Sequence, residues 1–168
     1  GLNVAIISLI GRFIGEGNMA KTRQVIMSGF LLGLCYSGAL ALLFVIQRGP
    51  LVSMFLLGSS DDAAIMDLAS MMMLGLATYV MADALILVSS GVLRGAGDTR
   101  WLMWMSVGLH WLMLLAQFLV IKVWALGPLV SWGVFVVAVL SVAAAYLWRL
   151  SGPVWRSEAA IARVMAEH

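Results

Sequence analysis

The sequence predicts an all-α fold, a polytopic bundle of transmembrane helices with about four complete spans and one truncated span. The first observation is composition, because 63% of the 168 residues are hydrophobic and only 11% are charged. A soluble domain usually carries about 25% charged residues, so this chain lacks the charge to cover a soluble surface. The second is that the apolar residues form long runs broken by short charged segments. The third is that successive connections are alternately rich and poor in Lys and Arg.

Each predicted helix is an apolar run bounded by residues that end helices. A helix needs about 20 apolar residues to cross a bilayer core. The first run is shorter, and we expect it to be the end of a helix that begins upstream of Gly1. Residues 59–62 (SSDD) precede the third run as typical N-cap residues, whose acids suit the positive end of the helix dipole. The predicted spans are about 1–14, 25–47, 63–93, 101–121 and 129–148, within a transmembrane lobe of residues 1–150 that precedes a tail of residues 151–168.

The basic residues lie mainly on one side of the predicted bundle. Alternate connections on that side carry eight of the ten Lys and Arg residues, and the other side carries Arg48 and Lys122. The positive-inside rule places the richer side and the C-terminus in the cytoplasm, and the loop of Asp61 and Asp62 outside. The predicted connections are charged glycine turns at 15–24 and 94–100, an apolar interfacial segment at 51–58 and a short turn at 122–128.

Asp83 lies deep inside a predicted span. Arg94 marks the cytoplasmic end of that helix eleven residues later, which places Asp83 roughly 16 Å above it at 1.5 Å per residue. A charged side chain at that depth costs at least about 2.5–3.5 kcal/mol, so it normally faces a cavity, a partner or an ion path. A carboxylate there can take up and release a proton or bind Na⁺, because hard cations prefer oxygen ligands. The alternative is a fixed interhelical hydrogen bond.

His110 and Asn3 are further polar residues inside predicted helices. His110 follows Arg100 by ten residues, again near the middle of a span. Because imidazole titrates near neutral pH, His110 could be a proton relay or a substrate contact. A packed, hydrogen-bonded side chain is the alternative, and Asn3 poses the same choice. Ser89 and Ser90 are expected to be small residues that let helices pack closely.

The sequence has no pattern for enzyme chemistry or nucleotide binding. It contains no Ser/His/Asp set, metal-ligand cluster or second intramembrane acid, and its glycine turns lack the Walker pattern. The single cysteine, Cys35, cannot form an intrachain disulfide. We therefore expect a protein that is not an enzyme, has no cofactor and no nucleic-acid partner, and is surrounded by the lipid bilayer.

Two segments resemble the hallmark motifs of the multidrug and toxic compound extrusion (MATE) family. The segment GRFIGEGNMAKTRQ resembles the pattern G-R/Q-x-x-G-x-G-(N/D) followed by a basic stretch, and GVLRGAGDTR resembles the family's G-x-L-R-G-x-G-D-T-R loop. Their order and predicted sidedness fit one six-helix lobe, and the resemblance covers nearly the whole chain. The motif residues are Gly11, Arg12, Gly15, Gly17, Arg94, Gly95, Gly97, Asp98 and Arg100.

The resemblance implies a transporter with two six-helix lobes. This chain would be the C-terminal lobe from the end of the eighth helix to the twelfth, and an N-terminal lobe would lie upstream. The family implies export of cationic or amphipathic small molecules, driven by H⁺ or Na⁺. We expect the protein to lie in a bacterial plasma (inner) membrane. Some members carry an acid in the tenth helix, eleven residues before the loop arginine, that is implicated in cation coupling. Asp83 stands at that spacing before Arg94 and would be the coupling residue, including a possible Na⁺ ligand.

Two other functions remain open from the sequence. A lipid-linked saccharide flippase of the same superfamily would need several basic residues for anionic headgroups, and the interiors of the predicted spans contain no Arg or Lys. A non-transporting membrane scaffold would not depend on Asp83, so an Asp83→Asn variant separates a scaffold from a transporter.

Overall fold

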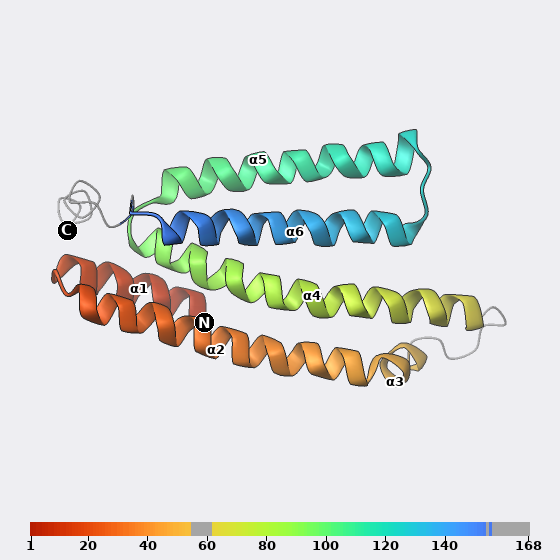
Figure 1. The fold of residues 1–168 in the computed structure, drawn as a ribbon, viewed down its shortest axis with the longest axis horizontal. Helices are drawn as coiled ribbons and strands as arrows, with labels where there is room; N and C mark the ends of the chain where they lie inside the picture. The colour runs from red at the N-terminus through yellow and green to blue at the C-terminus, as the bar shows by residue number, and fades with distance from the viewer. Residues whose placement is uncertain (55–61, 154, 156–168) are drawn as a thin grey trace.

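The computed structural model describes residues 1–54, 62–153 and 155, and of residues 62–64 the backbone alone. The described elements are all helices, and α4 lies between the α1–α2 pair and the α5–α6 pair (Figure 1). The predicted N-cap residues 59–61 and most of the predicted tail lie outside the described residues. The elements are α1 (Leu2–Gly15), α2 (Met19–Ile46), α3 (Arg48–Ser53), α4 (Asp62–Gly95), α5 (Thr99–Phe118), its π-helical continuation η1 (Leu119–Val123) and α6 (Pro128–Ser151).

Four helical stretches are long and apolar enough to cross a membrane, and α1 is a shorter apolar helix that reaches only part of the way along the bundle (Figure 1). Large side chains on the outer faces are apolar or aromatic, as lipid contact requires. Leu31, Trp104 and Trp111 are between 65% and 72% exposed. These features confirm the all-α transmembrane bundle that the sequence predicts. The four stretches are Met19–Ile46, Ile65–Gly95, Thr99–Val123 and Pro128–Ser151.

Both glycine turns are shorter than the sequence pattern predicts. The predicted turn 15–24 reduces to residues 16–18 because α2 begins at Met19, and the predicted loop 94–100 reduces to residues 96–98. The charged residues that bounded the predicted spans are therefore helical. Charge marks where side chains reach water, whereas a helix ends where its backbone groups find a cap.

The turn between α1 and α2 closes with two backbone hydrogen bonds. The N–H of Gly17 donates to Ile14 O at 3.0 Å, and the N–H of Asn18 donates to Phe13 O at 2.8 Å. This is the Schellman arrangement, which needs a residue in the left-handed region, and Gly17 has a φ of 66°. The Asn18 side chain then accepts from the N–H of Lys21 at 3.1 Å and so caps α2.

The turn between α4 and α5 repeats this backbone. The N–H of Gly97 donates to Arg94 O at 3.0 Å, the N–H of Asp98 donates to Leu93 O at 2.9 Å, and Gly97 has a φ of 76°. The Asp98 side chain makes no cap hydrogen bond to α5 and instead accepts from Arg149 Nε on α6 at 2.7 Å. Both turns lie at the same end of the bundle, which we call the turn end (Figure 1).

Close contact between α2 and α4 depends on small residues. A Cβ added at Gly29 or Gly33 would meet Val88 of α4 at 3.4 and 3.2 Å. Ser37, one turn further along the same face of α2, is also buried. In a bilayer the lipid tails are as apolar as the side chains, so helices associate through close packing of this kind.

The contact between α1 and α4 is closer still, and here α4 contributes the small residues. A Cβ at Gly95 would lie 2.7 Å from Ile7 O and 2.8 Å from the Ile10 Cβ. A Cβ at Gly91 would lie 3.1 Å from Asn3 Nδ2. Because the backbone of α1 occupies the space of a side chain, glycine at position 95 sets the distance between the two helices.

The α6 helix is fixed to its neighbours by polar contacts at the end opposite the turns. The Trp132 indole lies against Gly75 of α4 and donates to Met72 O at 3.1 Å. Gln117 of α5 donates to Ser131 O at 2.8 Å and accepts from Ser131 Oγ at 2.6 Å. Together with the Asp98–Arg149 pair, these contacts hold α6 beside α4 and α5 at both ends.

Candidate functional site

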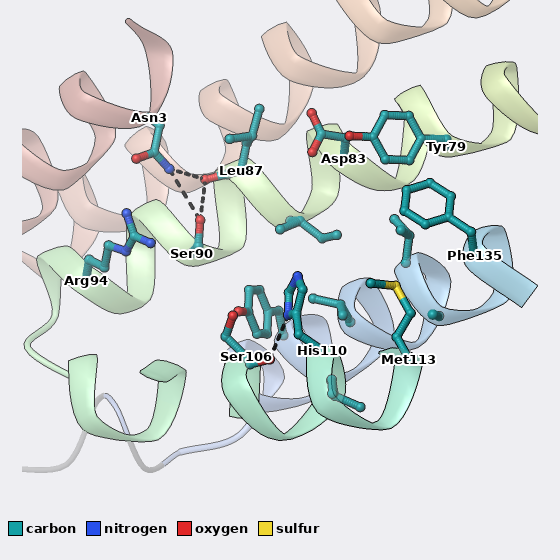
Figure 2. Close-up of a pocket in the computed structure, with 16 residues that line it drawn as sticks. Asn3, Tyr79, Asp83, Leu87, Ser90, Arg94, Ser106, His110, Met113 and Phe135 are labelled. Carbon is teal, nitrogen blue, oxygen red and sulfur yellow. Dashed lines mark hydrogen bonds between the residues drawn. The ribbon is translucent and has the colours of Figure 1, made fainter. Parts of the chain in front are cut away.

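A cavity of about 400 Å³ lies between α1, α4, α5 and α6. The three polar residues that the sequence singles out, Asn3, Asp83 and His110, all line it although they come from three different helices (Figure 2). Apolar side chains such as Ile86 and Phe135 form much of the remaining wall. The structure thus brings the candidate residues together. The polar or titratable lining residues are Asn3, Tyr79, Asp83, Ser90, Arg94, Ser106, His110 and Tyr146.

One face of α4 supplies most of the polar wall. Tyr79, Asp83, Leu87, Ser90 and Arg94 follow one another at intervals of three or four residues, which places them on one side of a helix. The sequence predicts that Arg94 is a loop residue, and this is wrong, because Arg94 belongs to α4 and lines the cavity. The eleven-residue spacing from Asp83 carries this signal, because eleven residues are close to three helical turns and so place both side chains on the same face of the helix.

Asn3 connects α1 to α4. Its Nδ2 donates to Leu87 O at 2.6 Å and to Ser90 Oγ at 3.3 Å, and Ser90 Oγ donates to the same Leu87 carbonyl at 3.1 Å (Figure 2). Ser90 therefore does more than the close packing expected of it. Ser89 is completely buried, and its hydroxyl has no hydrogen-bond partner among the described residues. Asn3 thus has the interhelical hydrogen bonds that are the alternative to ligand contact.

Asp83 differs from Asn3 because its carboxylate makes no hydrogen bond or ion pair with any residue that the structure describes. The side chain is half-buried, and it also borders a second cavity of about 640 Å³ between α1, α2 and α4. Among the described residues that line these two cavities, Asp83 supplies the one carboxylate. The expected alternative, a fixed interhelical hydrogen bond, is therefore not present within the described part of the chain.

His110 stands on α5 with its ring directed from that helix toward α4 (Figure 2). Its Nδ1 lies 2.7 Å from Ser106 O, one helical turn earlier. A carbonyl oxygen can only accept, so Nδ1 carries the hydrogen and the neutral ring has its acceptor at Nε2. The side chain is exposed rather than packed, with one ring nitrogen held by its own helix and the other on the cavity side (Figure 2); ligand contact by His110 stays a prediction.

The glycine motifs build the turn end and, with one exception, stay outside the cavity. Arg94 is that exception. Arg12 forms an exposed ion pair with Glu16 at 2.8 Å, Arg100 is exposed, and a Cβ at Gly11 would meet Gly95 O at an ordinary 3.5 Å. Gly17 and Gly97 close the two turns, Gly95 sets the helix contact and Asp98 forms the ion pair with α6. Gly15 is the last residue of α1, and nothing lies within 4 Å of a Cβ there.

A bundle of membrane-crossing helices around a cavity with ionisable groups in its wall is the architecture of an integral membrane transporter. Comparison with known families agrees with that class. The sequence model of the MatE family matches residues 1–118, more than half of the chain, and the chain therefore belongs to the MatE family of transporters. No solved structure matches the chain. The family membership confirms the resemblance stated from the two glycine motifs.

Proposed function

We propose that this protein exports cationic or amphipathic small molecules by antiport with H⁺ or Na⁺, through alternating access between this lobe and a second, N-terminal lobe. The single observation that carries the proposal is the Asp83 carboxylate, which borders a cavity inside membrane-spanning helices and has no partner among the described residues. A carboxylate at that depth is costly unless a cation occupies it for part of the cycle.

The proposed coupling is competition for one negative charge. An organic cation and the coupling ion both gain from contact with Asp83, and within a cavity of low dielectric they cannot share it without repelling each other. Ion entry would therefore weaken the hold on the organic cation and favour its release. The transporter, having released the organic cation, would then return to its starting conformation with the coupling ion bound.

Both coupling ions remain compatible with the residues of the wall. A proton needs only the Asp83 carboxylate, whereas Na⁺ needs several oxygen ligands, as hard cations do. Oxygen atoms suited to that role belong to the Asn3 amide and the Tyr79 hydroxyl, which line the same cavity. We include in the proposal a bacterial plasma (inner) membrane location with the turn end and the C-terminus in the cytoplasm, since the turn end carries most of the basic residues.

An anionic, lipid-linked substrate is less favoured by the same wall. Arg94 is the one Lys or Arg residue among the described lining residues of the smaller cavity, and it lies at the turn end. Asp83 lies roughly 16 Å further into the bundle, at three helical turns from Arg94. A pyrophosphate headgroup would meet a carboxylate at the deeper position, so drug export is the better supported function.

The test is ethidium efflux from proteoliposomes that contain the full-length protein, under a Na⁺ gradient and under a proton gradient in separate experiments. Asp83→Asn removes the charge with little change of shape, and we expect efflux to fall at least about tenfold, the equivalent of about 1.4 kcal/mol. The matched control is Asp67→Asn, which changes an exposed acid on the same helix that lines neither cavity. Equal efflux from both variants would refute the proposal, and the gradient that drives the wild-type protein identifies the ion.

A further inference from the structure

His110 presents a hydrogen-bond acceptor to the cavity because its other ring nitrogen is already engaged. The Nδ1–H bond to Ser106 O at 2.7 Å lies within one helix and does not depend on any ligand. It fixes both the tautomer and the ring orientation, so Nε2 of the neutral ring is an acceptor without a hydrogen of its own. The ring is directed away from α5 into the cavity (Figure 2).

The groups around this acceptor are few. From α4, Tyr79, Asp83 and Arg94 line the same cavity, and from α6 the one titratable group is Tyr146. The charged residue of η1, Lys122, is exposed and lies outside the cavity lining. Within the described residues none of these groups forms a hydrogen bond with His110. The Nε2 atom therefore remains free for a donor on a bound molecule.

We propose that His110 makes this transporter selective for ammonium substrates that keep an N–H, and that Nε2 accepts a hydrogen bond from that N–H. This inference rests on the proposed function, because it assigns a substrate class to the same cavity. Asp83 supplies the charge, which attracts protonated amines and quaternary ammonium ions alike. His110 supplies the directional contact, which a quaternary nitrogen cannot make.

The rest of the wall suits the organic part of such a molecule. Met113 and Phe135 line the cavity together with aliphatic side chains such as Ile86 and Leu109. A flexible methionine adapts to different shapes, and an aromatic ring offers its face to a cation. These contacts tolerate many carbon skeletons, so selection has to act at the nitrogen. A quaternary analogue cannot form the hydrogen bond that Nε2 accepts from an N–H, so it binds less tightly by the contribution of that one bond.

The test compares two probes that differ by one methyl group on nitrogen. The first is N,N-dimethylbenzylamine, which carries one N–H when protonated, and the second is benzyltrimethylammonium, which carries none. Equilibrium dialysis of the radiolabelled probes against the purified full-length protein near pH 7 gives both dissociation constants. We expect the wild-type protein to bind the N–H probe about three- to tenfold more tightly, the range of one net hydrogen bond.

His110→Leu should raise the dissociation constant of the N–H probe to that of the quaternary probe and leave the quaternary value unchanged. Unchanged quaternary binding also shows that the variant has folded. His110→Gln restores an acceptor and should recover part of the preference. A purely packing role would move both probes together, and such a parallel shift, or no shift at all, would overturn the inference.

Asp83→Asn separates this inference from the proposed function. If charge holds the cation, the variant weakens both probes by a similar factor and keeps their ratio. If the wild-type protein binds neither probe, the proposed function fails. If it binds both equally and His110→Leu changes nothing, the proposed function stands and only the role of His110 is lost.

Discussion

The turn between α1 and α2 and the turn between α4 and α5 share a backbone but use their final residues differently. Asn18 accepts from the N–H of Lys21 and caps its own helix. Asp98 reaches across to Arg149 of α6, and the two side chains are only 18% exposed. The first turn is therefore a local unit, whereas the second attaches the chain's last described helix to α4. One backbone motif can serve both roles because Gly17 and Gly97, in the left-handed region, let each turn close with backbone hydrogen bonds alone. The side chain of the next residue is then free to form other contacts.

The largest difference between the two turns should appear at their first glycines. A methyl group at Gly95 would collide with the backbone of α1, with Ile7 O at 2.7 Å, whereas nothing lies within 4 Å of a Cβ at Gly15. We expect Gly95→Ala to lower the free energy of unfolding by about 1–3 kcal/mol, the range of overpacked cores. Gly15→Ala should be neutral or stabilising by up to about 1 kcal/mol, since alanine favours a helix. Unfolding of the purified protein in SDS-containing mixed micelles measures both, and equal effects would contradict the close contact.

An intermediate effect is expected at the residues that follow the second glycines. Asp98→Asn removes the charge from the pair with Arg149 and should lower the free energy of unfolding by about 1–2 kcal/mol. A partly buried hydrogen bond between charged groups stabilises the fold by more than an exposed ion pair does. Asn18→Asp should cost little, since aspartate caps a helix as well as asparagine does. The same micelle assay with Asp98→Asn, Arg149→Gln and the double variant gives the coupling energy. Additive losses would mean that the pair contributes nothing beyond its separate residues.

The smallest effect is expected from removing the first cap. Asn18→Ala should cost about 1 kcal/mol, and the loss should be confined to the first turn of α2. Hydrogen–deuterium exchange can locate it, because the Lys21 amide loses its acceptor and should exchange faster. Amides in the first turn of α5 serve as the internal control, since Asp98 does not cap that helix. Faster exchange along the whole of α2 would mean that Asn18 holds more than the helix end.

The helices were predictable from sequence because apolar runs of bilayer length have few other folds open to them. The helix ends were not predictable in the same way. Lys21 and Arg23 mark the membrane boundary, but α2 already begins before them, at Met19. A single sequence does not show which face of α5 is turned toward α4. The pattern therefore singles out Asp83 and His110 but does not place them in one cavity. Arg94 was assigned to a loop because its motif was interpreted as a turn, although its helical spacing from Asp83 was available. The Asp98–Arg149 pair joins residues of separate helices, and no periodicity reports such a contact.

The positions of Arg94 and Asp83 give the cavity an electric field along the long axis of α4. The guanidinium is permanently positive, so the electrostatic energy of a cation falls as it moves from the turn end toward Asp83. When a proton or Na⁺ neutralises Asp83 in the proposed cycle, the arginine charge remains without its counterpart. The attraction toward Asp83 is then lost, and what is left is the repulsion by Arg94, which points away from the turn end throughout and is weakened by water and salt because that side chain is exposed. Under the proposed orientation that repulsion is directed outward, so two fixed residues three turns apart would give the export step its direction.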